Sequence, residues 1–258
     1  LRGYAFPGYA TKADSKPRYP QSYAVATADP DASERAFLPY RERAASVHLT
    51  RDLAAEPSNL LTPTAFAERI RQLAATGLKI EILDRPALEA LGMGALLAVA
   101  RGSAQPPFVA VMQWQGASDS AAPPLALVGK GVMFDSGGVN LKPAAFMLRM
   151  KADMSGAASV VGAMRSLAAR KAPVNVVGIV GLVENMPSGD AYKPSDVLTT
   201  MSGKTVEVVD TDNEGRLVLC DLLTFAERRY APRAIVDIAT LTGGARMALG
   251  AVYTPLFS

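Results

Sequence analysis

The hydrophobic positions change their period several times along this chain of 258 residues. Short apolar runs, typical of buried strands, alternate with longer segments in which apolar residues recur at helical spacing. Helices are clearest at residues 154–170 and 215–230. Strands are expected at residues 78–83, 108–112, 125–128, 174–183, 205–209 and 234–238. This alternation predicts an α/β fold with a largely parallel mixed sheet flanked by helices.

The first part of the chain is organised differently from the rest. Residues 1–32 are rich in Tyr, Pro and Lys, so we expect an edge segment or a linker there. Residues 33–58 have a charged helical pattern that ends in a Pro-containing stop signal. A second helix is expected over residues 65–75, because Thr62 is a favourable N-cap and Gly77 a favourable C-cap.

Composition and charge narrow the class of protein. Hydrophobic residues make up 49% of the sequence, which supports a sizeable buried core. The net charge is +3 and the basic residues are scattered, so charge alone does not indicate nucleic-acid binding. Apolar runs such as residues 93–100 are far shorter than the ~20 residues of a membrane-spanning helix, and the start shows no signal-peptide pattern. We therefore expect a cytoplasmic protein without membrane contact.

Two residue types that often carry catalysis occur once each. Cys220 is the single cysteine, so no intrachain disulfide can form. His48 is the single histidine, and it lies in the predicted charged helix, far from the other polar motifs. This excludes a Ser-His-Asp triad on the chain and makes Cys220, which lacks a neighbouring imidazole, a poor nucleophile.

The densest polar motif is VDTDNEGRL at residues 209–217, where an apolar strand leads into a helix. A second dense run is GKGVMFDSGG at residues 129–138, and two more charged residues follow it. Ligands of open α/β sheets bind at the carboxyl ends of the strands, so charged side chains that follow strands are expected to meet. The side chains expected to meet are those of Lys130, Asp135, Lys142, Asp153, Asp212, Glu214 and Arg216.

Carboxylates that cluster in a partly dry site raise one another's pKa unless cations neutralise them. Two divalent ions would balance the four carboxylates of this set. Oxygen donors without nearby Cys or His favour Mg²⁺ or Mn²⁺, and a carboxylate-rich zinc site is a further option. Desolvation and these cations are expected to lower the pKa of Lys130, so that its neutral amine can bind a metal.

Lys142 and Arg216 are expected to stay cationic. Their natural role is to stabilise negative charge that develops on a substrate oxygen. With no histidine nearby, a metal-bound hydroxide is the remaining strong nucleophile.

Six motifs carry a resemblance to a known family. They are GKGVMFDSGG (129–138), KP (142–143), MKADM (150–154), ENMPSG (184–189), TDNEGRL (211–217) and ATLTG (239–243). In this order they make the chain similar to the leucyl aminopeptidase (cytosol aminopeptidase) family, peptidase family M17, whose members are dinuclear-metal peptidases. The resemblance covers most of the chain and implies an enzyme that removes the N-terminal residue from peptides.

The resemblance implies a role for each charged residue of the motifs. Asp135 and Glu214 would bridge two divalent cations, which would be Mn²⁺ or Zn²⁺, with Mg²⁺ as a further option. Lys130 and Asp153 would complete one metal site, and Asp212 would complete the other.

The resemblance also implies the groups that act on the substrate. Lys142 would contact the substrate carbonyl, and Arg216 would hold a bicarbonate ion that serves as the general base. The residues implied to line the substrate pocket or bind the peptide backbone are Met150, Thr240, Leu241 and Gly243.

Two residues depart from the family's usual NTDAEGR motif. Asp210 takes the place of Asn, and Asn213 takes the place of Ala. Asp210 adds a negative charge near the implied specificity pocket. We therefore expect a shift from leucine-like toward basic N-terminal residues.

The resemblance further implies a domain division and an assembly. Residues 1–32 would be the end of an N-terminal domain, residues 33–58 a connecting helix, and residues 59–258 a metallopeptidase catalytic domain that lacks its C-terminal part. The family forms homo-hexamers. Two alternatives stay open, namely a catalytically incomplete oligomeric scaffold and a DNA-binding accessory protein of the same family.

Simpler structural explanations compete for two of the motifs. Thr211-x-x-Glu214 has the pattern of a capping box at the start of a helix. Met147, Met150 and Met154 recur at helical spacing, which is more typical of core packing than of a pocket.

Overall fold

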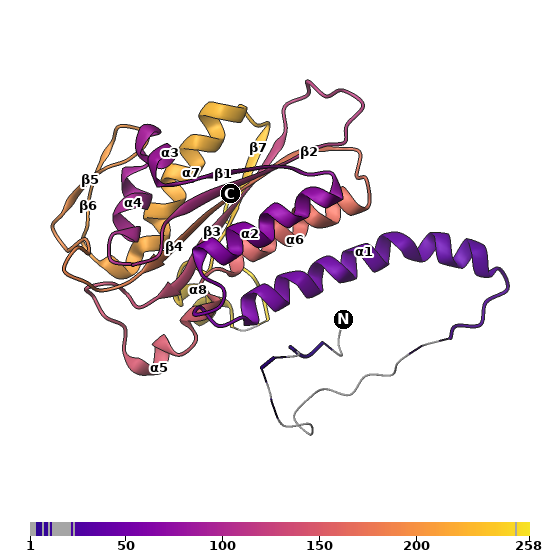
Figure 1. Ribbon diagram of the computed structural model, residues 1–258, viewed down its shortest axis with the longest axis horizontal. Coiled ribbons are helices and arrows are strands. Elements are labelled where there is room, and N and C mark those ends of the chain that lie inside the picture. Colours follow the sequence, from indigo (N-terminus) through magenta and orange to yellow (C-terminus); the bar gives the residue numbers. More distant parts are fainter. Residues whose placement is uncertain (1–3, 7, 10, 12–21, 23, 251) are drawn as a thin grey trace.

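The computed structural model describes residues 4–6, 8–9, 11, 22, 24–250 and 252–258. A five-stranded sheet lies at its centre, with the strand order β1-β2-β4-β3-β7 (Figure 1). β3 pairs in parallel with β4 and β7, whereas β2 is antiparallel to both β1 and β4. Four of these strands therefore run in one direction, and the predicted mixed, largely parallel sheet is confirmed. The strands are β1 (Lys79–Leu83), β2 (Phe108–Gln115), β3 (Leu125–Asp135), β4 (Asn175–Asn185) and β7 (Ala234–Ile238).

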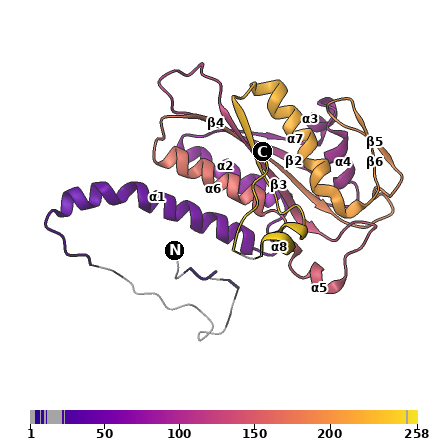
Figure 2. The ribbon, with the colours of Figure 1, turned by 180° about the vertical axis from the view of Figure 1, so that it is seen from behind.

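Helices cover both faces of this sheet (Figures 1 and 2). One face packs against α1 (Pro30–Ala55), α2 (Pro63–Gln72) and α6 (Ser155–Ala169), with α1 outermost. The other packs against α3 (Arg85–Ala90), α4 (Gly94–Ala100) and α7 (Glu214–Tyr230).

Alternate residues of a strand point to opposite faces, and β2 shows this directly. Val109 and Val111 belong to the core under α4 and α7, while Ala110 and Met112 belong to the core under α2 and α6. The central strands β2, β3 and β4 are thus buried on both sides, which explains why they appear in the sequence as continuous apolar runs.

The boundaries of the N-terminal helices follow their caps. α1 begins at Pro30, because the Asp29 carboxylate accepts a hydrogen bond from the Ala32 N–H and caps the first turn. Thr62 caps α2 as predicted, and a 3₁₀ turn (η2, Leu73–Thr76) ends at Gly77, whose φ is +94°. Of the predicted linker at residues 1–32, a large part lies outside the described residues.

The prediction for β3 was too short. An end at residue 128 was expected, but the strand continues to Asp135, so Lys130 lies inside the strand instead of after it. Gly129 allows α6 to pack close, since a Cβ atom there would lie 2.7 Å from Ala157 Cα. The charge of Lys130 interrupted the apolar run in the sequence, but ion pairs satisfy that charge inside the fold.

The remaining elements are short. The segment at residues 184–202 contains the end of β4 and one strand of a small antiparallel hairpin. None of the helices in the described ranges is long and apolar enough to cross a membrane. These elements are β5 (Val197–Thr199), β6 (Thr205–Glu207), α5 (Ala144–Met147), η3 (Met150–Ala152), η4 (Thr211–Asn213) and α8 (Gly244–Leu249).

Candidate metal centre

Six of the seven charged residues expected to meet do so at the carboxyl end of β3, and Arg216 is the exception. Asp135 is the last residue of β3, Asp212 lies in η4, and Glu214 begins α7. One carboxylate oxygen from each of these three residues lies within 4.8 Å of the other two. Asp153, which directly follows η3, and Lys130 adjoin them, because Lys130 pairs with both Asp153 and Glu214.

Lys130 is the buried cation of this cluster, with 2% of its surface exposed. Its Nζ lies 2.7 Å from Asp153 Oδ2 and 2.6 Å from Glu214 Oε1, and it donates a hydrogen bond to Thr240 O at 3.3 Å. Burial lowers the pKa of Lys130, but the carboxylates of Asp153 and Glu214 outweigh burial and raise it above its ordinary value. The predicted neutral amine is therefore not produced by the protein groups alone.

Lys142 is the second cation, and it approaches from the loop after β3. Its Nζ lies 2.8 Å from Asp135 Oδ2 and also pairs with Asp212 Oδ1. Burial lowers the pKa of Lys142, but hydrogen bonds to Asp135 and Asp212 outweigh burial and raise it. Lys142 thus stays cationic among these groups, as predicted.

Two ammonium groups do not fully compensate the four carboxylates. Burial is the main reason why the pKa of Glu214 rises to about 7, and nearby Asp135 and Asp153 raise it further. Burial also raises the pKa values of Asp153 and Asp212. Among the residues that the structure describes, Glu214 Oε2 is buried without a hydrogen-bond partner. A buried oxygen-rich donor set with excess negative charge and an unused acceptor fits divalent cations.

Thr211 does not form the capping box that its sequence pattern suggested. Its Oγ1 lies 2.6 Å from Gly137 O and accepts a hydrogen bond from Asn140 N, while the Glu214 side chain turns toward Lys130. Asp210 caps η4 instead, because its Oδ1 accepts from Asp212 N at 2.9 Å. The buried Thr211 side chain therefore fastens the 137–140 loop to the start of η4.

This loop needs glycine at position 138, and we expect Gly138→Ala to destabilise the fold by about 1–3 kcal/mol. The φ of Gly138 is +67°, and a Cβ atom would lie 2.9 Å from Asn185 Oδ1 and 3.0 Å from Thr211 Oγ1. Urea denaturation measures the change. The control is Gly189→Ala, where an added Cβ meets nothing within 4 Å. Equal stability of the two variants would contradict this account of the loop.

The predicted substrate-binding residues are only partly drawn into the cluster. Thr240 belongs to it, because its Oγ1 donates to Asp153 Oδ1 at 2.7 Å. Leu241 packs beside Gly215, at the start of α7. Met150 is half-buried in η3, and Gly243 is exposed directly before α8. Their contact with a substrate stays a prediction.

Arg216 points away from the carboxylates. It is exposed, and its Nη1 donates to Asn213 Oδ1 at 2.7 Å. Asp210, Asn213 and Arg216 line one cavity of about 370 Å³ beside η4. The two residues that depart from the family motif therefore share a cavity with the predicted bicarbonate-binding arginine.

Cys220, His48 and the three methionines do not form an alternative catalytic site among the described residues. Burial is the main reason why the pKa of Cys220 rises to about 12, so its thiolate is disfavoured. His48 is exposed and lies against Tyr4, with the two rings tilted and their centroids 5.3 Å apart. Met154 is fully buried in the core, as its helical spacing suggested, whereas Met147 and Met150 are half-buried.

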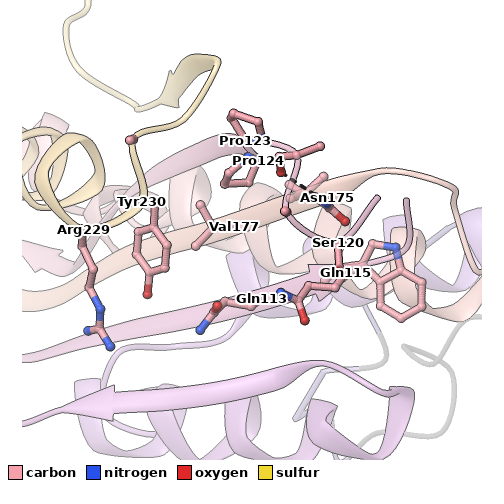
Figure 3. Close-up of a pocket in the computed structure, with 14 residues that line it drawn as sticks. Gln113, Gln115, Ser120, Pro123, Pro124, Asn175, Val177, Arg229 and Tyr230 are labelled. Atoms are coloured by element: carbon pink, nitrogen blue, oxygen red, sulfur yellow. Dashed lines mark hydrogen bonds between the residues drawn. The ribbon is translucent and has the colours of Figure 1, made fainter. Parts of the chain in front are cut away.

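A separate cavity of about 360 Å³ lies at the opposite ends of the strands (Figure 3). Asn175 and Val177 at the start of β4 line it, together with Gln113 and Gln115 from the end of the antiparallel β2. Ligands of open α/β sheets bind at the carboxyl ends of the parallel strands, so this cavity lies at the wrong end for the cluster's chemistry.

Sequence reasoning missed Asn185 and Asn140 as parts of the site. Asn185 is fully buried and donates a hydrogen bond to Asp135, and Asn140 bonds to Thr211. The available signals were the place of Asn185 in the ENMPSG motif and a polar residue at the end of the apolar strand β4. An amide at such a position is equally common in a turn, so the sequence alone could not assign it.

Comparison with known proteins places this geometry in a family. The model of the "Cytosol aminopeptidase family, catalytic domain" matches residues 48–258. A "Probable cytosol aminopeptidase" of Afipia carboxidovorans is 52% identical across the whole chain, and that of Methylorubrum populi is 50% identical. The chain spans about half the length of these curated relatives, 52% of each.

Solved structures show the same relationship. The "Bottromycin maturation enzyme BotP in complex with Mn" superimposes with a TM-score of 0.79 at 44% identity, covering 86% of this chain and 48% of that one. The Caenorhabditis elegans leucine aminopeptidase (LAP1) gives a TM-score of 0.79 at 34% identity, covering 82% and 43%. With a family match over most of its length and relatives aligned over all of it, the chain belongs to the cytosol aminopeptidase family.

Proposed function

We propose that this protein is a dinuclear-metal aminopeptidase that hydrolyses the N-terminal residue from peptides. The observation that carries the proposal is the buried cluster of Asp135, Asp153, Asp212 and Glu214 with two lysines, in a chain of the cytosol aminopeptidase family. Divalent cations would compensate the excess negative charge of this cluster, which explains how its carboxylates can be buried.

In this proposal the charged residues divide into two metal sites. Asp135 and Glu214 would hold both cations, Lys130 and Asp153 would complete one site, and Asp212 would complete the other. The unused Glu214 Oε2 supports a bridging role, because the second oxygen of that carboxylate already faces Lys130. When bound, the cations polarise the scissile carbonyl and lower the pKa of the attacking water.

The two remaining positively charged side chains, those of Lys142 and Arg216, act on the substrate. Lys142 orients the carbonyl of the scissile peptide bond and stabilises the negative charge that develops on its oxygen. Arg216 holds a bicarbonate ion as the general base, and its exposure beside a cavity supports access for a small anion. Met150, Asp210, Thr240, Leu241 and Gly243 bind the peptide.

Three further properties belong to the proposal. The metal is Mn²⁺ or Zn²⁺, and the structural neighbour BotP, which was solved in complex with Mn, supports Mn²⁺. The chain works in the cytoplasm, in line with the names of its relatives. It assembles as a homo-hexamer, as the family resemblance implied.

The test is the hydrolysis of leucyl- and arginyl-p-nitroanilide by the purified protein with Mn²⁺ and bicarbonate. We expect turnover that EDTA abolishes and Mn²⁺ restores, and that falls when bicarbonate is removed. Mn²⁺ binding without turnover would instead indicate a metal-binding scaffold. The absence of both Mn²⁺ binding and turnover would overturn the proposal.

Asp210 gives the proposal a specificity prediction. Its carboxylate lines the cavity beside η4, where it can attract a basic side chain. We expect Asp210→Asn to lower the ratio of arginyl to leucyl hydrolysis by about 10-fold, which corresponds to about 1.4 kcal/mol. Asn also caps helices well, so η4 is retained. An unchanged ratio of kcat/KM values for the two substrates would reject a specificity role for Asp210.

A further inference from the structure

Asn185 joins the two halves of the candidate metal centre. It is the last residue of β4, it is fully buried, and it pairs across the sheet with Asp135 at the end of β3. The register between β3 and β4 shifts just before this pair, between Val132 and Asp135. A change in register there alters where the Asp135 carboxylate points, so the local contacts of Asn185 decide its position.

The orientation of the Asn185 amide is fixed by chemistry. Its Nδ2 donates to Asp135 Oδ1 at 2.8 Å and to Thr211 O at 2.9 Å. Both partners are acceptors, so a flipped amide would place its oxygen against them and lose both bonds. The backbone is held as well, because Ser136 N and Ser136 Oγ both donate to Asn185 O, at 3.0 and 2.8 Å.

The two bonds connect segments that are distant in the sequence. Asp135 belongs to β3, whereas Thr211 is the first residue of η4 and directly precedes Asp212. Asp135 Oδ1 also accepts from Gly137 N at 2.9 Å, so Oδ2 is the oxygen that faces Lys142. One neutral side chain thereby fixes which Asp135 oxygen faces the centre and how far β3 lies from η4.

We propose that Asn185 is a positioning residue for the metal centre, acting through Asp135 and Thr211 to hold the ligands of β3 and η4 in register for divalent cations. This inference rests on the proposed function. A neutral donor suits the task, because an aspartate at this position would repel Asp135, and a lysine would add a third ammonium group to the cluster. Groups that hydrogen-bond to metal ligands change metal affinity by about 10–100-fold when they are removed.

The test compares Asn185→Asp with Asn175→Asp. Both residues are buried amides of β4, but Asn175 lies at the opposite end, where its Nδ2 donates to Asp119 O and Ala122 O (Figure 3). Isothermal titration with Mn²⁺ gives the affinity, and thermal unfolding in EDTA reports on the fold. We expect Asn185→Asp to weaken Mn²⁺ binding about 10–100-fold, and Asn175→Asp to leave it unchanged.

A second variant covers the case in which Asn185→Asp does not fold. Asn185→Ser adds no charge and no volume, but its hydroxyl is too short to reach both acceptors, so Mn²⁺ binding weakens here as well. Hydrolysis then needs more Mn²⁺ for half-maximal rate, with the KM for the peptide unchanged at saturating Mn²⁺. A folded Asn185 variant that binds Mn²⁺ like the unchanged protein overturns the inference. Failure of the unchanged protein to bind Mn²⁺ overturns the proposed function instead.

Discussion

Glu214→Gln is expected to lower kcat/KM by about 10³-fold or more, because it removes a charged ligand that two cations would share. Glu214 Oε1 pairs with Lys130, and Oε2 is a buried acceptor without a hydrogen-bond partner among the described residues. Glutamine keeps the size of the side chain but offers a weaker metal donor without charge. The measurements are peptide hydrolysis and Mn²⁺ titration, and both should fail together.

The fold should survive this substitution. Burial and the neighbouring carboxylates raise the pKa of Glu214 to about 7, so without cations the position already tolerates a neutral side chain near neutral pH. We therefore expect thermal unfolding in EDTA to change little. Glu227→Gln is the matched control, because Glu227 is an exposed carboxylate on the same helix. Retained Mn²⁺ affinity in Glu214→Gln would contradict the assignment of Glu214 as a ligand.

The sheet was predictable from the sequence because its central strands β2, β3 and β4 are buried on both faces. Apolar runs for all five of its strands stand out, and the caps at Thr62 and Gly77 mark their helix correctly. The prediction was wrong where charge enters the core. Lys130 interrupts an apolar run, and only the positions of Asp153 and Glu214, distant in the sequence, explain why β3 continues through it.

The candidate site shows the same division. Its charged residues could be named from the sequence, because dense charge at strand ends is costly unless it is compensated. The neutral groups that hold these charged residues in place could not be named from the sequence. Thr211 matched a capping box, yet its hydroxyl contacts the 137–140 loop, and Asn185 stands in the ENMPSG motif, which says nothing of its bond to Asp135. Neutral residues in such roles are defined by partners that only the folded chain brings near.

Lys142 should separate catalysis from metal binding. We expect Lys142→Met to lower kcat by about 10²–10³-fold while Mn²⁺ affinity is kept. The Lys142 ammonium pairs with Asp135 and Asp212, which would both face cations in the loaded enzyme, so its removal leaves no ligand missing. What is lost is the positive charge that stabilises the developing oxyanion.

Lys193→Met is the control for this prediction, because Lys193 is an exposed lysine whose side chain is 61% accessible. Its hydrolysis rate and its Mn²⁺ affinity should both match those of the unchanged protein. If Lys142→Met instead loses Mn²⁺ binding to the same extent as Glu214→Gln, then Lys142 holds the carboxylates together and does not act on the substrate. A fall in kcat with intact Mn²⁺ binding places Lys142 on the reacting carbonyl, because no other step would require its charge once the cations are bound.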